Sequence, residues 1–249
     1  MKGAAEQIRV SLVIPGRNVS ETIAACLRAV SQLLGRDGLE EIVFVDDGST
    51  DQTSELVQGY PVHWVRSEGR GAAAARNVGW QAARMPFIWF IDADCVAEPQ
   101  ALRLLLAHLK DPQVAAVGGS YANLRPEHLL ACLVHEEIIQ RHLRMPKDVN
   151  VLASYHVIYR REVLEKVGGF DPSCRWAHDA ELSYRVGKVG RLRFVPDSRV
   201  GHFHPIRWLA YLNKQYQQGF WRVMLYRRHP RRMLGDSYSG GMDFAQPPL

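Results

Sequence analysis

The chain has 249 residues, of which 47% are hydrophobic and 23% are charged, as in ordinary globular proteins. This length allows a substantial core in one large α/β domain or in one and a half domains. Lys and Arg total 31 against 26 Asp and Glu, and this mild excess favours an anionic substrate, a nucleic acid or a membrane surface without choosing among them.

The four cysteines lie far apart in the sequence, and none belongs to a CxxC pair. This spacing argues against structural zinc and against a disulfide framework. The first ten residues are too short and too polar for a signal peptide, and no run of about eighteen apolar residues is present to span a bilayer. We therefore expect a cytoplasmic protein, at most at the cytoplasmic face of a membrane.

The first half alternates short apolar runs with helical patterns. Runs rich in β-branched and aromatic residues predict strands at 10–14, 42–45, 62–65, 87–91 and 114–117. Amphipathic patterns predict helices at 20–34, 72–83 and 99–109, and Ser20 is the expected N-cap of the first. This alternation predicts an α/β fold, with a mostly parallel sheet and helices on both faces.

The second half is less regular. Its patterns predict helices near 127–143, 161–167 and 178–189, a strand at 192–195, and apolar segments at 151–159 and 206–226. The last segment is rich in aromatic residues and precedes an Arg cluster, which suits a membrane interface. A helix packed beside the substrate site is the favoured interpretation, and a membrane contact and a dimer contact are the alternatives.

Polar clusters follow the strands of the first half, at 15–18, at 46–51 and at the Asp92-Ala93-Asp94 triplet. Ligands gather at the carboxyl ends of parallel strands, and buried carboxylates are costly unless they are paired or bound to metal. Hard oxygen ligands favour Mg²⁺ or Mn²⁺ over zinc. Such an ion holds a pyrophosphate and stabilises the charge of a departing nucleoside diphosphate. An ordinary surface turn is the alternative interpretation of the triplet.

The ordered motifs at 11–18, 45–51, 71–79 and 92–94 resemble those of family 2 glycosyltransferases, over about residues 8–205. The resemblance implies a GT-A fold and metal-dependent sugar transfer from a nucleotide-sugar, with UDP as the favoured nucleotide. It implies a nucleotide-sugar-binding half at 1–95, an acceptor-binding and catalytic-base half at 96–205, and a C-terminal amphipathic helix and tail at 206–249. The expected acceptor is a carbohydrate or a lipid-linked sugar, and nucleic acid is not an expected partner.

The resemblance also implies roles for residues on the nucleotide side. Asp47 matches the carboxylate that hydrogen-bonds the base, and Pro15 and Arg17 line the same pocket. Arg70 and Arg76 lie in the segment that meets the diphosphate or the base. A structural ion pair is the alternative role for Arg76.

The family pattern makes Asp94 the metal ligand and Asp92 its partner near the ribose and the metal-bound waters. Histidines follow the predicted strand at 192–195, and related enzymes carry a histidine there as a further metal ligand. The run at 198–202 resembles that of polypeptide GalNAc-transferases, which favours His202 over His204. A structural hydrogen-bonding role is the alternative for both.

The acceptor side of the pattern is matched at 168–171 and at 178–185. Asp179, just inside a predicted helix, matches the carboxylate that takes the acceptor proton in an inverting transfer. Family members usually place Glu before this residue, whereas this chain has His178. A helix N-cap is the structural alternative for Asp179.

Two further features refine the expected function. Processive relatives usually carry a Gln-x-x-Arg-Trp motif, and this chain has Phe220 where Arg would be, so we expect one transfer per encounter. A dinucleotide-dependent oxidoreductase would need a glycine-rich turn after the first strand, which is missing. A sugar nucleotidyltransferase and a degenerate binding module remain as alternatives.

Overall fold

The computed structural model describes residues 8–230 and 235–238, and nine strands within them form one sheet in the order β3-β2-β1-β4-β8-β6-β9-β5, with β7 paired to β9. The strands are β1 (Val10–Gly16), β2 (Leu39–Asp46), β3 (His63–Arg66), β4 (Phe87–Ile91), β5 (Cys95–Ala97), β6 (Val114–Asn123), β7 (Asp148–Val149), β8 (His156–Arg160) and β9 (Arg191–His202). Because β8 is antiparallel to both β4 and β6, six strands run one way and only β5, β7 and β8 oppose them. The predicted mostly parallel sheet is confirmed.

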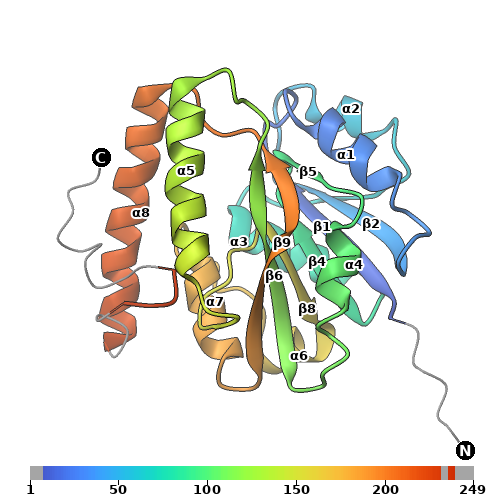
Figure 1. Ribbon diagram of the computed structural model, residues 1–249. Helices are drawn as coiled ribbons and strands as arrows, with labels where there is room; N and C mark the ends of the chain where they lie inside the picture. The colour runs from blue at the N-terminus through green and yellow to red at the C-terminus, as the bar shows by residue number, and fades with distance from the viewer. Residues whose placement is uncertain (1–7, 231–234, 239–249) are drawn as a thin grey trace, which may run out of the picture.

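Helices cover both faces of the sheet (Figure 1). They are α1 (Ile23–Ser31), α2 (Thr53–Val57), α3 (Ala72–Ala82), α4 (Ala101–Leu106), α5 (Leu129–Arg144), α6 (Arg161–Val167), α7 (His178–Val186) and α8 (Trp208–Arg228). Successive side chains of a strand point to opposite faces, so Leu12 joins the core under α1 and α4, whereas Val13 joins the core under α3, α6 and α7. Both clusters combine residues from before and after residue 95, so the two predicted halves share one sheet.

Helix α3 lies unusually close to the sheet because of Gly79. A Cβ atom on Gly79 would collide with Cγ1 of Val13 in β1. The missing side chain therefore sets the depth of α3, which begins next to the carboxyl ends of β1 and β2.

Several predicted boundaries differ from the structure. Ser20 is not an N-cap: α1 begins at Ile23 after Thr22, and the backbone N–H of Ser20 instead donates to Oδ2 of Asp51, 3.1 Å away. Strand β9 continues to His202 through a polar stretch, because Ser120 and its neighbours in β6 pair with that stretch after a register shift. The short strands β5 and β7 were not predicted, since each depends on its partner β9.

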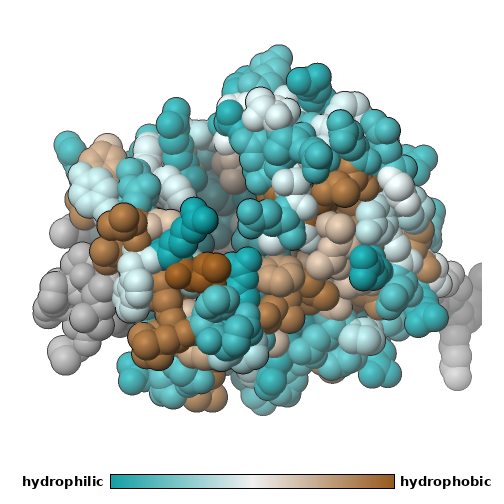
Figure 2. All heavy atoms as spheres, turned by 90° about the horizontal axis from the view of Figure 1, so that it is seen from above, coloured by the Kyte–Doolittle hydropathy of each residue, from teal (hydrophilic) through white to brown (hydrophobic). Residues whose placement is uncertain are grey.

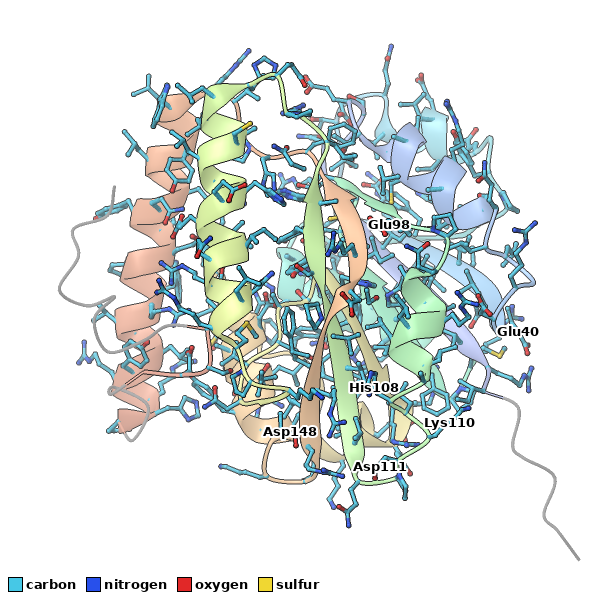
Figure 3. The ribbon with its side chains drawn as sticks, in the orientation of Figure 1. Glu40, Glu98, His108, Lys110, Asp111 and Asp148 are labelled. Atoms are coloured by element: carbon cyan, nitrogen blue, oxygen red, sulfur yellow. The ribbon has the colours of Figure 1, made fainter. Side chains whose placement is uncertain are left out.

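The carboxyl ends of β1, β2, β4, β6 and β9 meet at one edge of the sheet, at the top of Figure 1. Glu98 lies toward this edge, whereas His108, Asp111 and Asp148 lie toward the opposite one (Figure 3). The predicted tail falls partly outside the described residues, at 231–234 and 239–249. No described helix has both the length and the hydrophobicity that crossing a membrane requires.

Candidate active site

The loops after β1 and β2 are tied together by a network of short hydrogen bonds. Asn18, in the left-handed region at φ 53°, accepts a bond from the backbone N–H of Thr50 at 2.8 Å and donates its own backbone N–H to Oγ of Ser49 at 3.0 Å. Asp46 accepts the backbone N–H of Ser49 at 2.7 Å and the hydroxyl of Ser54 at 2.8 Å. Asn is among the few residues that adopt this backbone conformation readily. Together with the two hydrogen bonds, this explains why Asn stands at position 18 of the motif.

Asp47 is buried beside a cavity at the ends of β2 and β3. Its carboxylate accepts hydrogen bonds from the hydroxyl of Ser67 and from the backbone N–H of Gly71, the latter at 2.9 Å. The cavity measures about 610 Å³ and is lined by Arg17, Gly48, Arg66, Ser67, Glu68 and Gly69. Pro15 is half-buried in β1, opposite Val45 of β2. The structure therefore brings Arg17 and the partners of Asp47 to one hollow.

Arg70 is bonded to Glu68, which lines this cavity, but it is not itself a lining residue. Its side chain is 69% exposed, and Nη2 pairs with the equally exposed Glu68 at 3.0 Å. Such a pair stabilises the fold by less than about 1 kcal/mol, so it leaves the arginine free to move.

Arg76 lies in a buried polar cluster under the crevice. Its Nη2 pairs with Oδ1 of Asp92, and its Nη1 lies 3.2 Å from Nε2 of His178. The guanidinium carbon lies 5.8 Å from the ring centre of Phe170. Among the described residues, Nε of Arg76 has no hydrogen-bond partner. The ion pair proposed as the structural alternative is present, and Asp92 is its partner.

Asn77, in the same helix, ties the two parts of the chain together. Its Nδ2 donates to the carbonyl of Phe170 at 2.8 Å, and its Oδ1 accepts the backbone N–H of Phe170 at 2.9 Å. This clamp fixes the turn at Gly168 and Gly169, whose φ angles are 78° and 68°. Asn77 therefore positions the turn that leads toward α7.

Asp92 and Asp94 follow β4 and lie close enough to Asp179 for its charge to act on Asp92. Burial raises the pKa of Asp92, and the charges of Asp94 and Asp179 raise it further, against the lowering effect of Arg76. Burial alone would raise the pKa of Asp94, but the hydrogen bond and the charge of His202 outweigh it, so that pKa is lowered. The charge of Lys214, on α8, lowers the pKa of Asp94 as well. Neighbouring carboxylates thus have pKa values that move in opposite directions.

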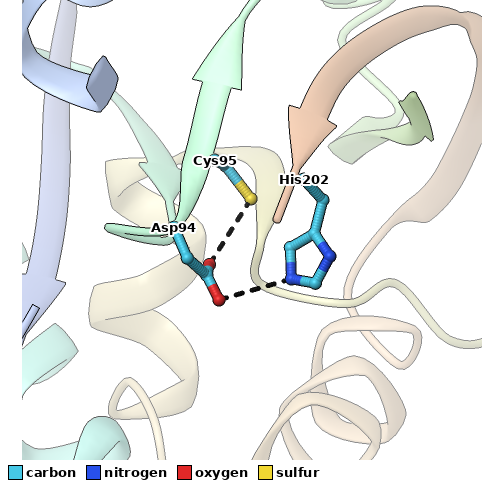
Figure 4. Close-up of side chains that lie close together, drawn as sticks. All are labelled: Asp94, Cys95 and His202. Atoms are coloured by element: carbon cyan, nitrogen blue, oxygen red, sulfur yellow. Dashed lines mark hydrogen bonds and ion pairs between the residues drawn. The ribbon is translucent and has the colours of Figure 1, made fainter. Parts of the chain in front are cut away.

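Asp94, Cys95 and His202 form a compact group of potential ligand atoms (Figure 4). Nε2 of His202, at the end of β9, lies 3.3 Å from Oδ2 of Asp94, and Sγ of Cys95 lies 3.7 Å from its Oδ1. Two ligand atoms about 2.1 Å from one divalent ion, at a right angle, would be about 3.0 Å apart. The carboxylate and the imidazole therefore fit such an ion. Burial raises the pKa of the Cys95 thiol well above its ordinary value, so Cys95 is a protonated donor to Asp94.

His204 lies behind His202 and does not face Asp94. Its Nδ1 lies 2.9 Å from Nδ1 of His202, and its Nε2 lies 3.2 Å from Nδ1 of His135 in α5. Of the two histidines, only the ring of His202 contacts the carboxylate of Asp94.

Asp179 lies in the first turn of α7, and its side chain is 29% exposed. Its Oδ1 accepts the hydroxyl of Ser154 at 2.6 Å and lies 3.1 Å from Nε2 of His178. Burial raises the pKa of Asp179, but His178, Arg76 and Ser154 together lower it well below its ordinary value. Asp179 is therefore an ionised acceptor at neutral pH. The structural alternative of an N-cap is not observed, because Ala177 is the N-cap residue of α7.

Several residues of this site could not be identified from the sequence. Ser67 and Ser154, which hold the carboxylates of Asp47 and Asp179, belong to no motif, and Lys214 lies in a helix of unassigned role. His178 carried one signal, its departure from the family pattern.

Comparisons with known proteins concern the family and the fold of the chain. Residues 11–168 match the family model described as Glycosyl transferase family 2. The pre-mycofactocin glycosyltransferase of Mycobacterium tuberculosis is 29% identical over 246 residues, which cover 93% of this chain and 50% of that protein. The glycosyltransferase AglE of Haloferax volcanii is 27% identical over 228 residues, which cover 87% of this chain and 74% of that protein. The chain thus spans about half the length of the mycobacterial relative.

A solved structure, the mannosyltransferase PcManGT of Pyrobaculum calidifontis in complex with GDP-Man and Mn²⁺, matches with a TM-score of 0.71 at 22% identity. The match covers 91% of this chain and 65% of that chain. At this identity the likeness concerns the fold, and the predicted GT-A fold is confirmed.

Proposed function

Because the chain belongs to glycosyl transferase family 2, we propose that it moves a sugar from a nucleotide-sugar to an acceptor hydroxyl with the help of a divalent cation. The observation that supports this most is the meeting of Asp94 and His202, from the ends of separate strands, beside Asp92 and Asp179. In this proposal residues up to 95 bind the donor and residues 96–205 hold the acceptor and the base.

On the donor side, the cavity next to Asp47 suits a nucleotide base. The buried carboxylate would accept a hydrogen bond from a ring N–H of the base, with Pro15 and Arg17 beside it. A UDP-sugar is the donor we propose, and a GDP-sugar is the alternative, since the archaeal mannosyltransferase was solved with GDP-Man. Arg70 is exposed at the rim and would reach the diphosphate.

Asp94 and His202 would hold Mn²⁺ or Mg²⁺, and the mixed carboxylate and imidazole ligands favour Mn²⁺. The bound cation would supply positive charge to the diphosphate. Asp92, held by Arg76, would face the ribose and the waters around the cation.

We assign the base to Asp179 because it is ionised and partly exposed in the crevice. In an inverting transfer the acceptor oxygen forms a bond to the anomeric carbon while its proton passes to the Asp179 carboxylate. The bond from that carbon to the diphosphate oxygen breaks on the opposite side, and its electron pair leaves with the nucleoside diphosphate. Phe220, in place of the processive motif's Arg, favours one transfer per encounter.

The first test is a thermal-shift panel of UDP, GDP, dTDP and CDP, each with Mn²⁺, Mg²⁺ or EDTA. A ligand that binds only the folded protein raises its melting temperature by mass action. We expect one nucleotide, UDP, to stabilise the protein only when metal is present, and the Asp94→Asn variant to lose this dependence. A nucleotide shift that EDTA does not change would contradict the metal role of Asp94 and favour a degenerate binding module.

We also propose a peripheral membrane contact through α8, because an exposed apolar stripe runs along it. Its members recur every three or four residues, as on one helical face: Leu209, Leu212, Tyr216, Phe220 and Val223. Exposed leucines of α5 lie on the same side of the molecule, where hydrophobic atoms gather in Figure 2. Exposed Arg227, four residues after Val223 on the same helical face, adds positive charge for an anionic headgroup surface. A lipid-linked acceptor would follow from such a contact.

Flotation with anionic vesicles tests this contact. We expect salt-sensitive binding that is lost in a Leu209→Glu, Tyr216→Glu double variant and kept in Leu56→Glu, which changes an exposed leucine of α2. Equal flotation of the double variant and Leu56→Glu would show that the apolar stripe of α8 is not the membrane-binding surface. A doubled mass in light scattering that the double variant restores to monomer would show a dimer contact instead.

A further inference from the structure

Three histidines form a continuous chain that leads away from Asp94. Nε2 of His202 faces Oδ2 of Asp94, and Nδ1 of His202 lies 2.9 Å from Nδ1 of His204. Nε2 of His204 then lies 3.2 Å from Nδ1 of His135, a half-buried residue of α5. Each contact joins two ring nitrogens, so the hydrogen on one ring determines the hydrogen on the next.

We propose that His204 and His135 are positioning residues: when a cation binds at Asp94, Nδ1 of His204 accepts the Nδ1 hydrogen of His202, Nδ1 of His135 accepts from His204, and the Nε2 lone pair of His202 is thereby directed to the cation. This inference rests on the proposed metal site. It concerns residues that neither the family motifs nor the DxD triplet includes.

The tautomers follow from the contacts. A histidine that ligates metal through Nε2 carries its hydrogen on Nδ1, since a neutral imidazole has one donor and one acceptor. The Nδ1–H of His202 meets Nδ1 of His204, which must therefore accept, so His204 carries its hydrogen on Nε2. That hydrogen donates to Nδ1 of His135, which leaves His135 with its hydrogen on Nε2. All three rings are then neutral, and each contact has one donor and one acceptor.

The reverse arrangement is equally self-consistent. With Nε2–H of His202 donated to Asp94, Nδ1 of His202 accepts from His204, and Nε2 of His204 accepts from His135. Both arrangements hold the same number of protons. Cation binding would therefore reverse the direction of the hydrogen bonds without releasing a proton from the chain.

Packing keeps the rings in this geometry. His204 is fully buried and His202 is 7% exposed. The ring of Tyr121 lies 4.7 Å from the His202 ring and 5.7 Å from the His204 ring, centre to centre. The backbone carbonyl of His204 accepts a bond from Nη1 of Arg125 at 3.0 Å. A buried ring nitrogen without a hydrogen-bond partner is unfavourable, so removing one ring disturbs the next.

The test compares Mn²⁺ affinity, measured from the free-ion signal in electron paramagnetic resonance, for wild type and five variants. His204→Phe keeps an aromatic ring but offers no acceptor to His202, and His204→Asn returns an acceptor oxygen near the former Nδ1. His135→Phe removes the end of the chain. His108→Phe is the matched control, since it changes a half-buried histidine at the opposite edge of the sheet (Figure 3). Asp94→Asn removes the proposed ligand itself.

We expect His204→Phe to weaken Mn²⁺ binding by about 10- to 100-fold, which is the range typical of residues that orient a metal ligand. His204→Asn should recover most of this loss, His135→Phe should cost less than His204→Phe, and His108→Phe should match wild type. If His204→Phe binds Mn²⁺ within twofold of wild type while Asp94→Asn does not bind it, the inference is wrong and the metal site stands. If wild type itself does not bind Mn²⁺, the metal site and the inference both fail.

A structural role alone would lower the melting temperature of His204→Phe without changing the affinity of the folded protein. Circular dichroism identifies any variant that does not fold, in which case His204→Asn and His135→Phe carry the test. Imidazole ¹⁵N shifts give a second readout with diamagnetic Mg²⁺. We expect Nδ1 of His204 to change from a protonated to an unprotonated nitrogen when the ion is added, and an unchanged Nδ1 would contradict the reversal.

Discussion

Nη1 of Arg76 lies 3.2 Å from Nε2 of His178, although 102 positions separate them in the chain. The carbonyl of Arg175 only accepts hydrogen bonds, so Nδ1 of His178 donates to it at 3.1 Å. The same Nε2 lies 3.1 Å from Oδ1 of Asp179. The imidazole ring of His178 thus lies between a fixed cation and the proposed base, at a position where family members usually carry Glu.

This arrangement predicts how His178 affects the pH dependence of transfer. The charge and the hydrogen bond of His178 lower the pKa of Asp179. In His178→Gln this charge is absent, so the pKa of Asp179 rises and the carboxylate is protonated at a higher pH. The acid limb of the kcat/KM profile should therefore move to higher pH, and it should move further in His178→Glu, whose negative charge favours protonation. An acid limb that stays in place in both variants would separate His178 from the titration of the base.

Asp179→Asn should remove most of the transfer activity. An amide cannot take the acceptor proton, and general base catalysis contributes about 10²- to 10⁴-fold. Nucleotide binding in the presence of Mn²⁺ should be unchanged, because no donor contact is assigned to Asp179. Ser154→Ala is the companion variant, since it removes only the 2.6 Å hydrogen bond to Oδ1, and it should cost less than Asp179→Asn. Equal turnover by Asp179→Asn and wild type would falsify the base assignment.

Arg76→Met should destabilise the fold strongly. Removing the guanidinium leaves the carboxylate of Asp92 beside Asp94 and Asp179 without its cation, and breaking a buried pair costs about 3–5 kcal/mol. Urea unfolding measures this loss. Asp92→Asn in the Arg76→Met background should restore part of it, because the uncompensated charge is gone.

Arg70→Met provides the control for Arg76→Met. Its ion pair with Glu68 is exposed, so the free energy of unfolding should change by less than about 1 kcal/mol. Similar losses of unfolding free energy in the two variants would show that burial does not determine how much the Arg76–Asp92 pair stabilises the fold.

The carboxyl edge of the sheet could be predicted from local patterns alone. The apolar run of β4 ends directly before Asp92, and the polar clusters after β1 and β2 are continuous in the sequence. Parallel pairing of these strands then brings the clusters to one edge, which sequence periodicity and connectivity determine together. The roles of the individual residues at this edge came from the resemblance of the ordered motifs to those of the family.

Contacts between distant segments could not be predicted in this way. The pairing of Cys95 with His202 depends on β5 meeting β9, and β5 has only three residues. The partners of Arg76 come from β4 and from α7, and no periodic pattern identifies which buried groups will meet. Ser20 shows the opposite error, because a favourable N-cap residue was engaged by Asp51 in the neighbouring loop.

The last prediction concerns stability in acid and rests on His142 of α5. This side chain is buried, its Nδ1 lies 2.8 Å from Oγ of Ser120, and burial lowers its pKa to about 4. The ordinary pKa of histidine is about 6.5, so above that pH the ring is neutral in the folded and unfolded chains and contributes no pH dependence. Between about 6.5 and 4 the unfolded chain binds a proton that the folded chain does not, so stability falls as pH falls.

Urea unfolding from pH 7.5 to 4 should therefore show a decrease to which His142 contributes up to about 3 kcal/mol, since each unit of pKa difference corresponds to about 1.4 kcal/mol. His142→Gln keeps a hydrogen-bonding group near Ser120 but cannot take up a proton, so its stability should fall less steeply over this interval. His63→Gln, which changes an exposed histidine of β3, should keep the wild-type slope. If His142→Gln and His63→Gln lose stability equally on acidification, protonation of the buried His142 imidazole does not cause the decrease. Other buried groups must then account for the loss of stability.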